Sequence, residues 1–171
     1  MARPIAHSSG FSIAEALDAP SVDACRELFR EYQQGLGVSL CFQGFDRELE
    51  TLPGDYARPR GRLLLARIVG EPAGCVAVRP LGERDAEMKR LYVRPAYRGM
   101  GIGRVLAECA IDDARAIGYA MLKLDTLPAM GEAQRLYAEL GFSETQPYND
   151  NPVAGVRFLA LDLRRAGAAQ R

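Results

Sequence analysis

Residues 91–110 read LYVRPAYRGMGIGRVLAECA, and this run decides the fold. Gly99, Gly101 and Gly103 alternate between an apolar stretch typical of a strand and a stretch with helical spacing. A strand, a glycine-rich turn and the start of a helix form a general device for holding phosphate, because free backbone N–H groups and the positive helix end both point at the anion. Arg98, which leads the turn, can add a charge-assisted hydrogen bond to a phosphate oxygen.

The spacing of the glycines excludes two common phosphate-binding motifs. The turn reads G-x-G-x-G, whereas the dinucleotide fingerprint is G-x-G-x-x-G, and no Gly-Lys-Ser/Thr follows as a P-loop requires. A nucleotide-binding or nucleotide-hydrolysing protein is therefore disfavoured. Taken alone, the six residues leave one structural alternative open, a tight strand–helix turn in which glycine serves close packing.

Around this turn the sequence predicts a mixed α/β domain. EPAG separates two apolar runs and predicts a hairpin, and a third run leads into the glycine turn and a strand–helix–strand crossover. We expect a mixed sheet with helices on both faces, in one domain over 1–171 with a core of about 11–163 and flexible ends. Strands are expected at 11–16, 62–70, 74–82, 86–93, 119–126 and 156–163, and helices from an N-cap at Ser21, at 45–52, at 101–117 and at 131–140.

Composition excludes several classes of protein. Lys plus Arg and Asp plus Glu each number 22 in 171 residues, so no net field favours nucleic acid or an anionic membrane surface. No apolar run approaches the roughly 18 residues of a membrane span, and the N-terminus lacks the apolar core of a secretory signal, so we expect a cytoplasmic protein.

The cysteine and histidine content narrows the chemistry further. Cys25, Cys41, Cys75 and Cys109 lie far apart in apolar contexts and are interpreted as small core residues. His7 is the single histidine and falls in the terminus expected to be flexible. A zinc site and Ser-His-Asp or Cys-His catalysis are therefore improbable, and no metal is expected.

Two linked motifs resemble the GNAT superfamily of acyl-CoA-dependent N-acyltransferases. Its R/Q-x-x-G-x-G/A pyrophosphate loop is matched by Arg98, Gly101 and Gly103, with Gly99 as a further common glycine. The V-x-P-x-Y-R lead-in is matched before this loop, and A-x-x-L-Y-x-x-x-G-F is matched by AQRLYAELGF at 133–142. The resemblance covers residues 60–163 well and residues 11–60 only by the order of elements.

This resemblance implies a fold and a donor. The fold is a central mixed sheet of six to seven strands with a splayed central cleft, where a bulge in the 86–93 strand separates it from the next strand. The donor is acetyl-CoA, with its pyrophosphate on the turn amides and its pantetheine arm beside the end of the 86–93 strand. The residues implied in donor binding are Leu91, Tyr92, Val93, Arg98, Gly99, Met100, Gly101, Ile102, Gly103 and Arg104.

The resemblance also implies two catalytic residues. Glu87 occupies the place of a glutamate that serves many family members as general base, although charge patterning alone favours a solvated or salt-bridged carboxylate near Lys89 or Arg90. Tyr137 occupies the place of the tyrosine that approaches the CoA sulfur as general acid, and the alternative is a core aromatic residue. Relatives often carry Asn where this chain has Met130, so that polar contact to pantetheine is absent or made by backbone.

The implied activity is acetyl transfer to a primary amine of a small molecule or peptide, and the alternative is a non-catalytic acyl-CoA-binding or sensing domain. The region from Tyr32 to Tyr56 and the 145–155 loop are expected to form the acceptor site, with ordinary packing as the alternative. Relatives that pair through C-terminal strands leave a homodimer through residues 156–163 open. The acceptor candidates are an apolar wall of Phe42, Phe45, Leu52, Tyr56 and Tyr148, and the carboxylates Glu48, Asp55 and Asp150.

Overall fold

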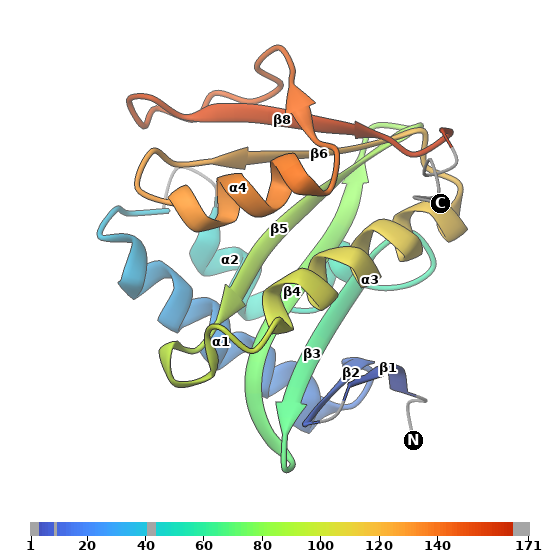
Figure 1. The fold of residues 1–171 in the computed structure, drawn as a ribbon, viewed down its shortest axis with the longest axis vertical. Coiled ribbons are helices and arrows are strands. Elements are labelled where there is room, and N and C mark those ends of the chain that lie inside the picture. The colour runs from blue at the N-terminus through green and yellow to red at the C-terminus, as the bar shows by residue number, and fades with distance from the viewer. Residues whose placement is uncertain (1–3, 9, 41–43, 166–171) are drawn as a thin grey trace.

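The computed structural model describes residues 4–8, 10–40 and 44–165, which form one mixed sheet with helices on both faces (Figure 1). Within this part of the chain the sheet has eight strands in the order β1-β2-β3-β4-β5-β6-β8-β7. Neighbouring strands are antiparallel except β5 and β6. The strands are β1 (Pro4–Ser8), β2 (Phe11–Glu15), β3 (Arg62–Ile68), β4 (Glu71–Leu81), β5 (Asp85–Val93), β6 (Met121–Thr126), β7 (Ser143–Glu144) and β8 (Arg157–Asp162).

Helices α3 (Ile102–Ile117) and α4 (Gly131–Glu139) cover one face of the sheet, and α1 (Ala19–Leu36) and α2 (Phe45–Thr51) cover the other (Figure 1). The central strands are therefore buried on both sides. Leu64 packs in the core under α3 and α4, whereas Leu63 and Leu65 pack in the core under α1 and α2. The expected α/β class is confirmed. None of the described helices is long and apolar enough to cross a membrane.

The structure differs from the local expectations in four places. The turn between β3 and β4 is Val69–Gly70, with φ of 48° and 84°, and EPAG belongs to β4. Two positive φ angles match the right-handed twist of a tight hairpin. The N-cap of α1 is Asp18, whose carboxylate accepts a hydrogen bond from the Ser21 N–H at 2.8 Å. Pro4–Ser8, expected in a flexible end, pair with β2, and the two-residue strand β7 adds to β8 beyond the expected strands.

The sheet opens between β5 and β6, as the resemblance implied. Their parallel ladder joins Asp85–Glu87 to Met121–Lys123 and ends there, although β5 continues to Val93. The β4–β5 register shifts between Cys75 and Ala77, and Arg90 on the opposing stretch of β5 has a φ of 60°. This bulge bends β5 away from β6, and it leaves the β6-facing edge of β5 without a partner strand among the described residues.

Candidate active site

A groove with a volume of about 570 Å³ runs between the end of β5, the start of α3 and the start of α4. The glycine turn forms part of its wall. Gly99 and Gly101 both have a φ of 81°, and a Cβ built at either would meet no atom within 4 Å. Backbone conformation, not close packing, therefore requires glycine at these two positions. Gly101 is the N-cap of α3 and no side chain caps the helix, so the first-turn N–H groups stay available to an anion.

The structure brings together eight of the ten residues expected at the donor site. Leu91, Tyr92, Val93, Arg98, Gly99, Gly101, Ile102 and Gly103 line the groove. Met100 is 48% exposed and does not line it, and the Arg104 side chain turns to Glu139 and Glu108. Neither Met100 nor Arg104 therefore contributes to the wall of the groove.

The Arg98 side chain is anchored at the rim of the groove. Its Nε donates a hydrogen bond of 3.1 Å to the Val93 carbonyl, and its guanidinium carbon lies 6.0 Å from the centre of the Tyr92 ring. Burial raises the pKa of the Tyr92 hydroxyl beside it, and the Glu31 carboxylate acts in the same direction. Arg98 thus places a cation next to the amides of the turn.

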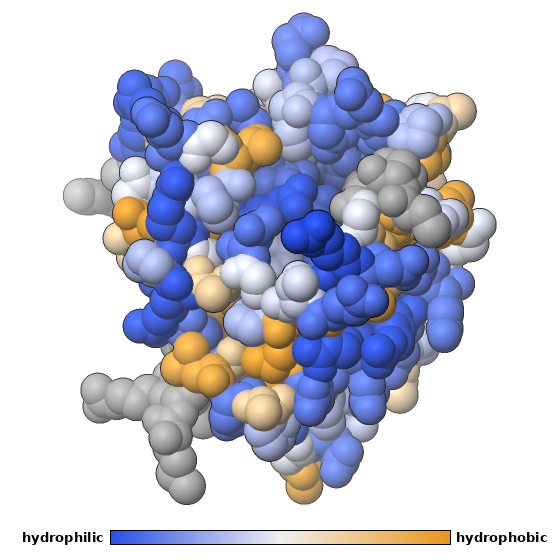
Figure 2. Space-filling view, turned by 180° about the vertical axis from the view of Figure 1, so that it is seen from behind, coloured by the Kyte–Doolittle hydropathy of each residue, from blue (hydrophilic) through white to orange (hydrophobic). Residues whose placement is uncertain are grey.

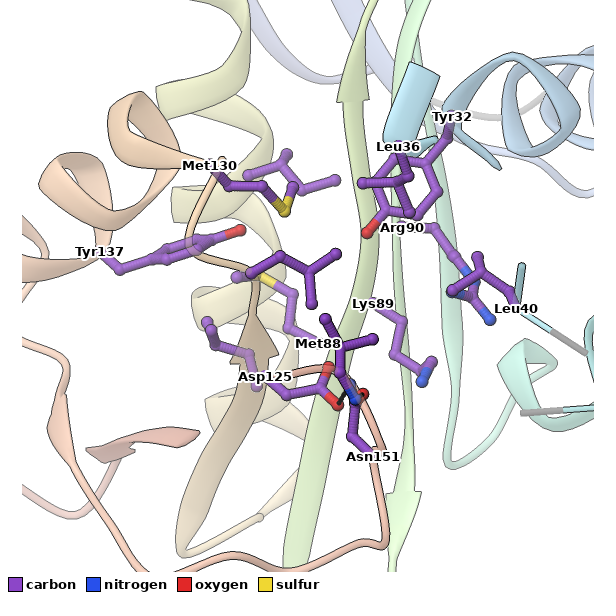
Figure 3. A pocket seen from close by; sticks show the side chains of 14 residues that line it. Tyr32, Leu36, Leu40, Met88, Lys89, Arg90, Asp125, Met130, Tyr137 and Asn151 are labelled. Atoms are coloured by element: carbon purple, nitrogen blue, oxygen red, sulfur yellow. Dashed lines mark hydrogen bonds between the residues drawn. The ribbon is translucent and has the colours of Figure 1, made fainter. Parts of the chain in front are cut away.

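The groove leads to a smaller inner cavity of about 30 Å³ (Figure 3). Tyr32, Leu36, Leu91 and Met130 line both spaces. The Met130 sulfur accepts a 3.9 Å hydrogen bond from the Thr126 hydroxyl. The other residues that line the inner cavity are Leu40, Met88, Lys89, Arg90, Leu124, Asp125, Leu127, Tyr137, Asn151 and Val153.

Tyr137 has structural features that agree with both of the roles considered for it. It is 5% exposed and its ring packs against Phe142 with centres 5.7 Å apart, as a core aromatic does. It also lines the inner cavity, and its hydroxyl forms no hydrogen bond within the described residues. Burial raises the pKa of Tyr137, so the hydroxyl keeps its proton at neutral pH and can donate it.

Glu87 lies one residue away from the inner cavity and does not line it. Its carboxylate is 1% exposed and accepts hydrogen bonds from Arg79 Nε at 2.8 Å and from the Tyr148 hydroxyl at 3.0 Å. Lys89 Nζ lies 3.6 Å from Glu87 Oε1, and Lys89 does line the cavity. Burial lowers the pKa of Lys89, and the charge of Glu87 opposes this shift. The salt-bridged alternative for Glu87 is therefore present, with Arg79 as an additional partner.

The expected acceptor region contributes less to the cavity than predicted. Phe45, Leu52 and Tyr56 are buried in the core under α1 and α2, whereas Phe42 lies outside the described residues. Tyr148 stacks edge-on against Phe158 with ring centres 5.4 Å apart. Among the expected carboxylates, Asp150 is exposed on its loop and Asp55 lines a separate surface depression with Glu48.

Glu48, expected to attract a cationic acceptor, forms an ion pair with Arg90, the residue at the β5 bulge. Arg90 donates to the two carboxylate oxygens at 3.0 and 2.7 Å, and the Tyr56 hydroxyl donates to Oε1 at 2.6 Å. Burial acts to raise the pKa of Glu48, but the bonds from Arg90 and Tyr56 outweigh it and hold that pKa below its ordinary value. The Arg90 guanidinium also lies 5.0 Å from the centre of the Phe45 ring. These contacts hold the bulged backbone in place.

Sequence reasoning missed Asp125, at the end of β6. Its Oδ2 accepts hydrogen bonds from Asn149 Nδ2 at 3.0 Å and from Asn151 Nδ2 at 3.1 Å. The side-chain oxygens of Asn149 and Asn151 also accept hydrogen bonds from backbone N–H groups of their own loop, which holds the turn in this loop. The sequence did carry a signal for Asp125, because it is a carboxylate near the end of a strand in which apolar residues alternate with polar ones.

Comparisons with known proteins agree with this architecture. The model of the acetyltransferase (GNAT) family matches residues 22–142. An uncharacterized N-acetyltransferase of Schizosaccharomyces pombe is 39% identical over 92% of this chain and 98% of its own length. An acetyltransferase from Streptococcus agalactiae superimposes with a TM-score of 0.75 at 20% identity, over 91% of this chain and 99% of its own.

A second solved structure is an acetyltransferase from Salmonella typhimurium described with its cofactor acetyl-CoA. It has a TM-score of 0.69 and 22% identity, over 93% of this chain and 97% of its own. The family match covers more than half of the chain, and the fungal relative extends the likeness to almost all of it. The chain belongs to the acetyltransferase (GNAT) family.

Proposed function

We propose that this protein is an N-acetyltransferase that moves an acetyl group from acetyl-CoA to a primary amine of a small molecule or peptide. The observation that carries the proposal is the connection between the groove and the inner cavity, which share Tyr32, Leu36, Leu91 and Met130. An amide-rich turn lies at one end of this path and the Tyr137 hydroxyl at the other.

The groove offers groups that the donor would need. Backbone N–H groups from Gly99 to Gly103 would bind the pyrophosphate, with Arg98 adding a charge. The pantetheine arm would hydrogen-bond to the edge of β5 that β6 leaves open after Glu87. The thioester would then lie at the junction with the inner cavity. The Salmonella neighbour, described with acetyl-CoA, supports the choice of donor.

The reaction in this proposal is direct attack of the amine on the thioester. An alkylammonium group, with a pKa near roughly 10, must first lose a proton. We assign that proton to Glu87 and route it through water, because the Glu87 carboxylate does not line the cavity. The C–N bond forms, an N–H of the bulged strand binds the oxyanion, and the C–S bond breaks. Tyr137 donates its proton to the departing thiolate and regains one from the new amide nitrogen.

The test is a panel of primary amines and amino acids incubated with acetyl-CoA, followed by release of free thiol. We expect turnover with at least one class of amine and none without an acceptor. Binding of acetyl-CoA without turnover on any amine would refute the transferase proposal and support the acyl-CoA-binding domain instead.

A further inference from the structure

Tyr32 lies where the donor groove meets the inner cavity, opposite Tyr137. It belongs to α1 and lines both spaces, whereas Tyr137 lines the inner cavity from α4. Figure 3 shows the two hydroxyl groups pointing toward the space between them from opposite sides. Burial raises the pKa of Tyr137 and Tyr32 adds to this shift, so the two hydroxyls are within electrostatic reach of each other.

The neighbours of Tyr32 hold its ring in this orientation. The ring packs edge-on against Tyr92 with centres 6.3 Å apart, and the guanidinium carbon of Arg90 lies 5.9 Å from its centre. Arg90 is itself held by its ion pair with Glu48. The surface over α1 and α2 is mostly hydrophilic (Figure 2), and the half-buried Tyr32 points away from it toward the cavity. The hydroxyl is therefore positioned before any substrate binds.

The Tyr32 hydroxyl has a proton to donate and no acceptor for it among the residues that the structure describes. Four other tyrosine hydroxyls donate hydrogen bonds to a carboxylate or a carbonyl, namely those of Tyr56, Tyr92, Tyr119 and Tyr148. Tyr32 and Tyr137 do not, and these are the two whose hydroxyls face the inner cavity. Both donors are thus available to a group that enters from the groove.

The surroundings of Tyr32 keep its hydroxyl protonated. Burial raises the pKa of Tyr32, and Asp125 and Cys75 act in the same direction, whereas the charge of Arg90 opposes them. Burial prevails, so the pKa stays above its ordinary value and the O–H group persists at neutral pH. Tyr32 can therefore donate a hydrogen bond to a developing negative charge, and it is not suited to act as a base.

The inner cavity suits the reacting carbonyl group. Its volume of about 30 Å³ exceeds the roughly 10–15 Å³ that a water-sized group needs, and it is far below the roughly 300 Å³ or more of a pocket for a whole ligand. A thioester that reaches the junction along β5 can place its carbonyl oxygen here. Because the sulfur and the oxygen are bonded to the same carbon, hydroxyls on opposite sides can serve the two atoms separately.

We propose that Tyr32 is a catalytic residue whose hydroxyl donates a hydrogen bond to the oxyanion formed from the thioester carbonyl. This inference rests on the proposed acetyltransferase function and adds a side-chain donor to the N–H of the bulged strand. As the amine attacks, the C–N bond forms and the carbonyl π pair moves onto oxygen, where Tyr32 stabilises the charge without giving up its proton. The pair then re-forms C=O, the C–S bond breaks, and Tyr137 protonates the thiolate.

The first experiment is Tyr32→Phe, which keeps the ring against Tyr92 and removes the hydroxyl. With an amine that the wild-type protein acetylates, kcat for thiol release should fall about 10²- to 10³-fold, the usual effect of one lost oxyanion donor. The KM for the amine and the Kd of acetyl-CoA should stay near their wild-type values, because the lost bond is strongest in the transition state. A higher KM with an unchanged kcat would assign Tyr32 to acceptor binding and overturn the inference.

Tyr119→Phe is the matched control, since it removes the hydroxyl of a buried tyrosine that lines neither the groove nor the cavity. It should keep the wild-type kcat. Melting temperatures and calorimetric binding of acetyl-CoA verify that both variants are folded. A folded Tyr32→Phe protein with wild-type kcat would overturn the inference.

The pH profile separates oxyanion stabilisation from an effect on proton transfer. Because the Tyr32 hydroxyl stays protonated, Tyr32→Phe should lower kcat by the same factor between about pH 6 and 9, below the ordinary tyrosine pKa of roughly 10. A factor that changes with pH would show that Tyr32 acts through the base or the acid, and would overturn the inference.

The outcomes for the wild-type protein and for the variant distinguish the two proposals. Wild-type turnover together with an unchanged kcat in Tyr32→Phe refutes this inference alone and leaves the transferase function standing. Failure of the wild-type protein to acetylate any amine, despite binding acetyl-CoA, would remove the proposed function and this inference with it.

Discussion

Tyr137→Phe separates a catalytic hydroxyl from a core aromatic ring. The substitution removes one oxygen atom, keeps the ring against Phe142 and breaks no hydrogen bond within the described residues. Because no partner is left unsatisfied, we expect the free energy of unfolding to change by less than about 0.5 kcal/mol. The expected change in rate is much larger.

A general acid contributes roughly 10²- to 10⁴-fold, so kcat should fall by that factor. The fall corresponds to about 3–5 kcal/mol of transition-state stabilisation, at roughly 1.36 kcal/mol for each tenfold change. Since burial raises the pKa of Tyr137, the wild-type hydroxyl stays protonated, and its titration should not limit kcat near neutral pH. The binding of acetyl-CoA should be unchanged.

Thiol release at saturating acetyl-CoA measures kcat, and thermal denaturation measures stability. Tyr119→Phe is the matched control, because the Tyr119 hydroxyl donates to the Arg60 carbonyl at 2.7 Å in the same core and away from the cavity. That variant should lose about 1 kcal/mol, or roughly 2–4 °C of melting temperature, and keep its kcat. If Tyr137→Phe instead loses stability and keeps its rate, Tyr137 is a core residue only.

Three further changes test the rest of the site. Glu87→Gln should lower kcat at neutral pH by roughly 10²-fold or more without changing the Kd of acetyl-CoA, and unchanged turnover would remove Glu87 from the mechanism. Gly74→Ala would place a Cβ 2.6 Å from the Tyr92 carbonyl oxygen, so it should displace β5 at the groove. We expect a loss of about 1–3 kcal/mol in the free energy of unfolding and weaker binding of acetyl-CoA in calorimetry. Wild-type affinity for acetyl-CoA would contradict this prediction. Arg90 and Tyr56 hold the pKa of Glu48 in the folded protein below its value in the unfolded chain, although burial acts in the opposite direction. The ionised Glu48 therefore stabilises the fold fully above the unfolded pKa of roughly 4.3. This stabilisation is lost as the pH falls through the pKa of the folded state. Denaturant titrations between about pH 3 and 7 should therefore show that the free energy of unfolding falls less steeply at acid pH in Glu48→Gln than in the wild type. An equally steep fall in the two proteins would argue against this role of Glu48.

Local patterns were sufficient for most of the fold. Apolar periodicity located the central strands and α1, α3 and α4, and the glycine turn located the start of α3 within one residue. The short edge strands β1 and β7 were missed because pairing with a neighbour, and not periodicity of their own, holds them in the sheet. The β3–β4 turn was misplaced because Val69 rarely takes a positive φ, and the demands of the hairpin overrode that preference.

The candidate site also has features set by local sequence and features set by tertiary packing. The sequence by itself determined the family, the amide-rich turn and the position of Tyr137, because each depends on residues close together in the chain. Only the tertiary structure decided the surroundings of the reacting groups. The hydrogen bond from Tyr148 to Glu87 joins residues 61 positions apart in the sequence, and the hydrogen bond from Arg90 to Glu48 joins residues 42 positions apart. The opening of the sheet beside the groove depends on where the β5–β6 ladder ends, which is a property of two strands packed together and of neither strand alone.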